Sequence, residues 1–119
     1  MVRTTTPTHY FKFPIDPDTH FSEIQITYRQ DDEIKLVKDK TDLTFYNAGT
    51  EAEPIYMGKY RLTQEETALF RGNMPGDTQA KRHVYIQVKV QKNEEGGDVL
   101  ASKPFRVSVW DVLNSDLLG

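Results

Sequence analysis

Alternation of apolar and polar residues limits most strongly how this chain can fold. Between residues 84 and 91, valines and an isoleucine alternate with Tyr, Gln and Lys, and residues 23–29 alternate in the same way. Successive side chains of a β-strand point to opposite faces of a sheet, so each segment has one buried and one solvated face. We therefore predict two half-buried strands at these positions.

Five further segments have strand composition: residues 9–13, 33–39, 43–46 and 55–62, and a return over 99–113 that Pro104 breaks or confines to a sheet edge. Turn-forming residues recur about every 8–12 positions, which is typical of sandwiches. The sequence thus predicts an all-β fold, an antiparallel immunoglobulin-like β-sandwich of about seven strands. Gly58 lies where the pattern of 55–62 changes phase, so we expect a β-bulge there.

These strands form one domain over residues 9–113, preceded by a flexible lead-in at 1–8 and followed by a tail at 114–119. Alternation also predicts which residues point inward. The expected core consists of Ile24, Ile26, Ile34, Leu36, Val84, Ile86, Val88, Phe105, Val107 and Val109.

One short helix interrupts the strands. Thr63 and Glu66 have the spacing of a capping box, in which each side chain bonds the backbone of the other residue. Gly72 and Pro75 prevent a long continuation. We expect a helix of about two turns that starts at Thr63 and covers one end of the sandwich.

Composition limits the partners and the compartment. The 119 residues include no cysteine, which leaves no disulfide and no thiolate site for zinc. A formal net charge of −3 with scattered basic residues argues against nucleic acid as a partner. No apolar run approaches the roughly 20 residues that span a bilayer, and no signal peptide is visible, so we expect assembly in a cytoplasm and no membrane partner.

No residue pattern indicates an active site. The three histidines are far apart, and the acidic stretch at 16–20 is better explained as a proline-bracketed turn than as a calcium loop. Glu65 and Glu66 are adjacent in the first turn of the expected helix, where capping and the helix dipole account for them. We predict that the protein is not an enzyme and holds no cofactor or metal.

The expected last strand offers a candidate interface. Alternation from Phe105 puts Trp110 beside Arg106, away from the core, unless the strand bends after Val109 or a loop covers the indole. Tryptophan and arginine are enriched at binding hot spots. Arg106, Trp110, Leu117 and Leu118 are the candidate interface residues.

Three stretches resemble a known group of proteins. They are residues 24–30, residues 62–67 after a strand, and residues 85–90 with the return over 100–109. Together they look like small β-sandwich proteins encoded in prophages of Gram-positive bacteria, and more distantly like the amino-terminal domain of phage upper-baseplate proteins. The loops at 47–54 and 72–82 are longer than this group implies.

The resemblance implies a structural or assembly protein of a virion, in the tail or baseplate, assembled in the bacterial host cytoplasm. Its partners would be other phage structural proteins or a second copy of the chain. A carbohydrate-binding or adhesion module is the alternative, because six tyrosines could line a sugar-binding platform. An intracellular regulator made during infection is a third possibility.

Overall fold

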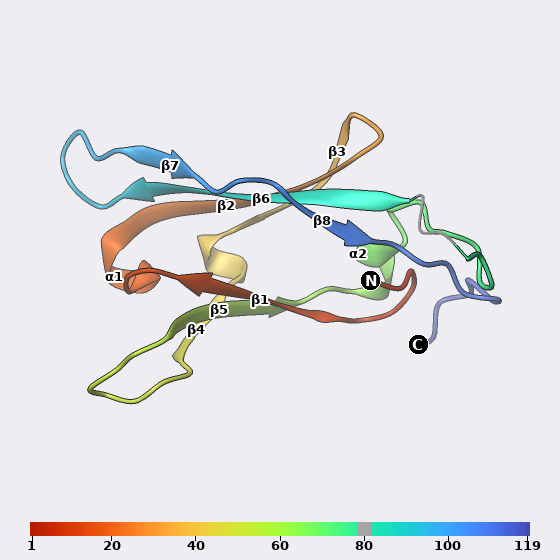
Figure 1. Cartoon of the computed structure of the whole chain (residues 1–119), viewed down its shortest axis with the longest axis horizontal. Coiled ribbons are helices and arrows are strands. Elements are labelled where there is room, and N and C mark those ends of the chain that lie inside the picture. Colours follow the sequence, from red (N-terminus) through yellow and green to blue (C-terminus); the bar gives the residue numbers. More distant parts are fainter. Residues whose placement is uncertain (79–81) are drawn as a thin grey trace.

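The computed structural model describes residues 1–78 and 82–119, and it consists mainly of two facing antiparallel sheets (Figure 1). This arrangement confirms an antiparallel, sandwich-like β fold. The three-stranded sheet has the order β1-β5-β4, formed by Thr8–Phe13, Tyr56–Arg61 and Thr44–Asn47. In the five-stranded sheet β3-β2-β6, with both β7 and β8 paired to β6, the strands are Glu33–Asp39, Phe21–Gln30, His83–Lys92, Val99–Ala101 and Phe105–Ser108.

A tight hairpin turn connects β2 to β3. Asp31 and Asp32 both have positive φ, 53° and 61°, as a two-residue hairpin loop requires. Aspartate tolerates this conformation better than most residues because its short side chain bonds the local backbone. The turn joins β2 and β3 in an antiparallel hairpin.

The core forms where the inner faces of the two sheets meet, and most of the expected core residues lie there. Ile24, Ile26, Val84, Ile86 and Val109 are buried, and three more are partly buried. The partly buried ones are Leu36, Val88 and Val107. The other buried core residues, outside the expected list, are mainly aromatic: Phe11, Phe13, Phe21, Tyr28, Tyr60 and Phe70, with Leu43 and Leu62.

Ile34 and Phe105 were wrongly assigned to the core. Ile34 is 65% exposed because the register between β2 and β3 shifts after Tyr28, which turns Ile34 to the outer face opposite Arg29. Phe105 is 43% exposed because it begins β8, an edge strand with no neighbour on its outer side among the described residues.

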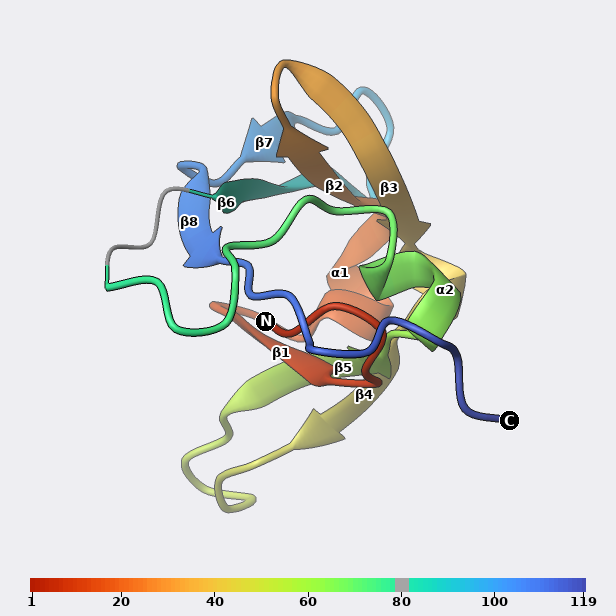
Figure 2. The ribbon, with the colours of Figure 1, turned by 90° about the vertical axis from the view of Figure 1, so that its right-hand side faces the viewer.

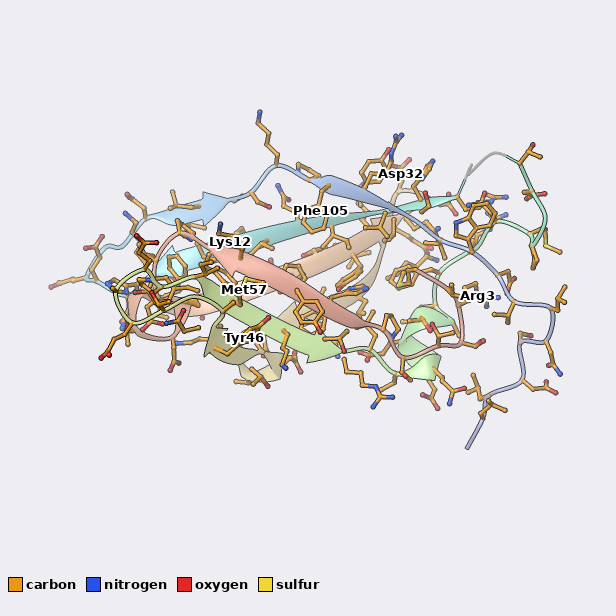
Figure 3. All side chains as sticks on the ribbon, turned by 60° about the horizontal axis from the view of Figure 1, so that its bottom comes forward. Arg3, Lys12, Asp32, Tyr46, Met57 and Phe105 are labelled. Carbon is orange, nitrogen blue, oxygen red and sulfur yellow. The ribbon has the colours of Figure 1, made fainter. Side chains whose placement is uncertain are left out.

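Gly58 is a regular member of its strand, so the expected bulge is wrong. It pairs in register with Phe11 on β1 and with Phe45 on β4. Gly58 is on the inner face of β5, the same face as Tyr60. Met57 on β5 and its register partner Tyr46 on β4 are on the outer face (Figure 3). The apparent change of phase arises because an inward position carries no side chain.

The helix α2, Gln64–Thr67, confirms the predicted start at Thr63 but is one turn long rather than two. Thr63 Oγ1 accepts from the Glu66 backbone N–H, and the Glu66 carboxylate accepts from the Thr63 N–H. Two other helical turns lie in the described residues: α1, Pro17–His20, and η1, Lys40–Asp42.

Residues 1–5, part of the expected lead-in, lie against α2 and the last part of the chain. The backbone of Trp110 donates to the carbonyl of Met1 and accepts from the N–H of Arg3, both at 2.8 Å. The Arg3 guanidinium contacts both oxygens of Asp111 at 2.9 Å. Thr5 bonds the buried Thr67 through its N–H and its carbonyl. Flexibility of this segment in solution stays a prediction.

Candidate protein-binding site

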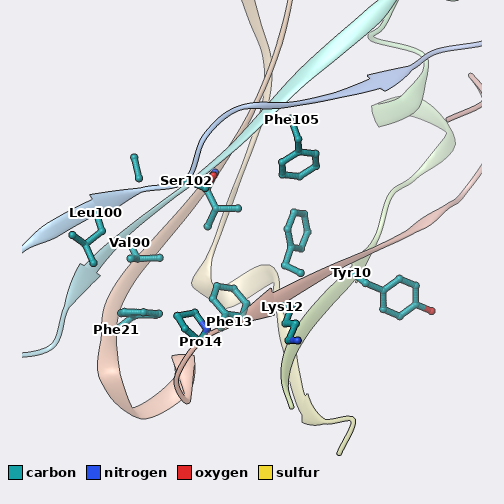
Figure 4. A pocket seen from close by; sticks show the side chains of 12 residues that line it. Tyr10, Lys12, Phe13, Pro14, Phe21, Val90, Leu100, Ser102 and Phe105 are labelled. Carbon is teal, nitrogen blue, oxygen red and sulfur yellow. The ribbon is translucent and has the colours of Figure 1, made fainter. Parts of the chain in front are cut away.

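An apolar groove opens along one seam of the sandwich, between β1 and the edge formed by β7 and β8 (Figure 4). It has a volume of about 400 Å³ and is lined mainly by aromatic and aliphatic side chains. Phe13 and Phe21 lie at one part of the groove, and Phe105 lies above β1 at another. The lining is complementary to an apolar occupant.

The groove is open because neither sheet continues across the seam. Among the described residues β1 pairs only with β5, and β7 and β8 pair only with β6. The backbone groups on the outer side of β1 are therefore available to another extended chain, as at any sheet edge. Exposed Lys12 on β1 is the kind of charge that discourages indiscriminate edge pairing.

The break between β7 and β8 confirms the expectation at Pro104. Proline has no N–H for the ladder, and the strand stops at Ala101 and resumes at Phe105. Ser102 holds the break against β6: its N–H donates to the Val88 carbonyl at 2.8 Å, and its hydroxyl accepts from the Val88 N–H at 3.1 Å. The groove edge is therefore fixed by hydrogen bonds although the strand is interrupted.

The four residues of the expected interface lie in three separate parts of the structure. Arg106 is exposed on the outer face of the five-stranded sheet, opposite Tyr85 in register. Trp110 is partly buried, with its backbone bridged to Val2 and Asn73. Leu117 and Leu118 are exposed in the tail, where the Leu118 N–H donates to the Gln64 side chain of α2 at 2.8 Å. Figure 2 shows β8 and the carboxyl end on opposite sides of this end of the molecule.

A buried chain of hydrogen bonds joins the two sheets. The hydroxyl of Tyr28 on β2 bonds His9 Nδ1 on β1 at 2.6 Å and the hydroxyl of Tyr60 on β5 at 2.5 Å. Burial raises the pKa of both tyrosines well above the ordinary value, so both stay protonated at neutral pH. This chain satisfies polar groups inside the core and supplies no tyrosinate nucleophile.

His9 should make stability depend on pH. Burial, with the nearby charged amino terminus, lowers the pKa of His9 in the folded protein. As pH falls below the unfolded value of about 6.5, the unfolded chain takes up the proton first, so stability falls. We expect the melting temperature to drop between about pH 7.5 and pH 5.5, and to drop less in His9→Gln.

The exposed His20 provides the control for this prediction, and His20→Gln should keep the full dependence. The amino terminus, whose pKa burial also lowers, acts in the same direction in every variant, so the slopes are compared between variants. Equal slopes in His9→Gln and the unmodified protein would contradict the assignment.

Two of the acidic residues weighed in the sequence, Glu66 and Asp16, have structural partners. Glu66 caps α2 and forms an ion pair with Lys38; burial alone would raise its pKa, but these bonds hold the pKa below its ordinary value. Asp16 caps α1 by accepting from the Asp18 N–H at 3.1 Å. Within residues 1–78 and 82–119, no group of three or more His, Asp or Glu side chains is arranged to hold a metal ion. None of the helices in these ranges is long and apolar enough to cross a membrane.

Comparison with protein-family models, with curated proteins and with solved structures found no match.

The groove was not predicted from the sequence. Leu100 lines it and is 47% exposed, although alternation alone cannot distinguish such a residue from one on a covered face. The break at Pro104 was the available signal, because an interrupted edge strand leaves apolar neighbours uncovered.

Proposed function

We propose that the chain is a non-catalytic structural or assembly protein of a phage or prophage particle, in the tail or baseplate, that acts by binding other proteins. The apolar groove beside the free edge of β1 is the observation that carries the protein-binding part. The virion and its assembly in the host cytoplasm rest on the sequence resemblance. An immunoglobulin-like connection of the strands stays a prediction.

The occupant that suits the groove is an extended segment of a partner protein. Such a segment can pair its backbone with β1 while placing alternate apolar side chains into the groove, the binding mode called β-strand addition. A small apolar molecule would fill the volume but would leave the hydrogen-bonding edge of β1 unused. The aromatic lining offers large contact areas to the inserted side chains.

The glycan-binding alternative has less support. Tyr28 and Tyr60 are buried, and the two most exposed tyrosines, Tyr10 and Tyr85, lie on different sheets. The tyrosines therefore do not form one flat stacking surface.

Two neighbouring residues on β7 provide a matched test. Leu100 lines the groove, whereas Val99, 58% exposed, is outside it. A short synthetic peptide in which valine alternates with threonine should bind and shift the amide signals of Lys12 and Leu100. Leu100→Arg should weaken binding at least about tenfold, as expected for a hot spot, and Val99→Arg should not. A proline-containing version of the peptide should fail to bind because it lacks backbone donors.

Particle incorporation tests the virion part separately. In purified virions of the encoding phage, mass spectrometry should detect the chain with tail proteins, and Leu100→Arg should reduce its amount relative to Val99→Arg. Equal loss of binding in both variants would contradict the proposal that the peptide binds in the groove. Absence of the chain from particles would contradict the virion assignment and leave the groove standing.

A further inference from the structure

A row of exposed side chains crosses the outer face of the five-stranded sheet. The strand register places Arg29 on β2 opposite Tyr85 on β6, and Tyr85 opposite Arg106 on β8. Tyr85 is thus flanked by an arginine on each neighbouring strand. Ile34 on β3, opposite Arg29, extends the row with an exposed apolar side chain.

This face is hollowed beside the row. A depression of about 330 Å³ is lined by Arg29, Tyr85 and Lys89, together with the uncharged polar side chains of Gln25, Thr27 and Gln87. Its lining contains two cations and no carboxylate, in a chain whose formal net charge is −3. Positive charge is therefore concentrated in this depression, although the whole chain has a negative net charge.

The two arginines are available to a ligand. Within the described residues Arg29 has one ion pair, a 3.8 Å contact with the fully exposed Asp32 in the hairpin turn, and exposed pairs of this kind contribute little. Arg106 forms no ion pair with any residue in the described part of the chain. Carboxylates lie at the margins of this face, at Asp32 in the hairpin turn, at Asp39 opposite Gln25, and at Glu23, which lines a neighbouring depression with Gln25 and Lys89.

We propose that this Arg29–Tyr85–Arg106 surface binds an acidic, extended segment of a partner protein. Arginine is suited to carboxylates because its planar guanidinium can donate two parallel hydrogen bonds. The two arginines lie on strands separated by β6, which places their backbones roughly 10 Å apart. Carboxylates two residues apart in an extended peptide point to the same side and are about 7 Å apart, at about 3.3 Å per residue, a separation that two long arginine side chains can bridge.

Other anionic partners fit less well. A nucleic acid needs a continuous basic stripe along its phosphates, which three cations beside acidic rim residues do not provide. A sugar ring could stack on Tyr85, but a single exposed tyrosine between two arginines favours a charged ligand. The surface is on the opposite face of the sheet from Val88 and Val90, which line the groove, so this proposal does not depend on the proposed function.

The test compares two peptides and three charge reversals. A peptide of alternating glutamate and serine should bind and shift the amide signals of Arg29, Tyr85 and Arg106, whereas the glutamine–serine version should not. Arg29→Glu and Arg106→Glu should each weaken binding by about tenfold, or 1.4 kcal/mol. Arg61→Glu is the control, because Arg61 is an exposed arginine on β5 of the other sheet. Added salt should weaken the complex.

Melting curves of the variants show whether each protein is folded, and these exposed positions should leave the melting temperature nearly unchanged. Failure of the glutamate peptide to bind the unmodified protein at low salt would overturn the proposal. So would equal binding of the glutamine peptide, or an equal loss of binding in Arg61→Glu. Tighter binding of a sulfated oligosaccharide or an oligothymidylate than of the glutamate peptide would replace the protein segment with that class of partner.

Discussion

Replacing Ile86 by alanine should lower the free energy of unfolding by about 2–5 kcal/mol. Ile86 is 2% exposed on β6, opposite Tyr28 on one side and Phe105 on the other. The loss has two parts, the transfer free energy of the deleted carbons and the cavity that neighbouring strands cannot close. Chemical denaturation with a fluorescence readout measures the difference between the two proteins.

Ile34→Ala makes the same chemical change on the outer face, where Ile34 is 65% exposed. It should change the free energy of unfolding by no more than about 0.5 kcal/mol. Similar losses at the two positions would show that the register shift after Tyr28, which turns Ile34 outward, is incorrectly placed.

Gly58→Val should cost about 1–3 kcal/mol through overpacking, even though valine favours strands. A β-carbon at this position would approach Phe13 Cε2 to 3.1 Å, and Leu43 Cδ2 and Phe45 Cδ1 to 3.3 Å. The γ-carbons of valine would approach the same ring and methyl groups still more closely. Denaturant titration again measures the effect.

Met57→Val supplies the control because Met57 is the adjacent residue on β5 and faces the other side of the sheet. Its cost should stay below about 1 kcal/mol. If Gly58→Val were as stable as the unmodified protein, the inner face of β5 would have free space there, and the bulge expected from the sequence would again explain the pattern.

Local signals in the sequence were sufficient for the strands, for α2 and for most of the strand faces, whereas the helical turns α1 and η1 were not predicted. The alternation at 84–91 and at 23–29 located β6 and β2, and the Thr63–Glu66 spacing located the start of α2, because each depends on neighbouring residues alone. The errors at Ile34 and Gly58 have a different origin. One requires the extra residue that shifts β3 against β2, and the other requires the rings of Phe13 and Phe45 on the two strands that flank β5 in the same sheet.

The candidate surfaces depended on the same long-range information. Local sequence does not indicate that Arg29 and Arg106 flank Tyr85, because the two arginines are placed there by the pairing of β2 and of β8 with β6. The groove likewise needs the position of β1 relative to β7 and β8. Trp110 and Arg106 share a face by alternation, but the strand ends at Ser108, and the partly buried Trp110 belongs to the contact with residues 1–3.

The contact between residues 1–3 and Trp110 also determines when the protein can finish folding during synthesis. Arg3 and its partner Asp111 are 108 positions apart in the chain, so their contact cannot form until Asp111 has left the ribosome. Folds dominated by such distant pairings form in milliseconds to seconds, more slowly than helical bundles of similar size. Until residues 105–109 have emerged, Phe11 on β1 lacks its ring contact with Phe105 and the core lacks the buried Val109. A nascent chain stalled before residue 108 would therefore be the species most exposed to aggregation.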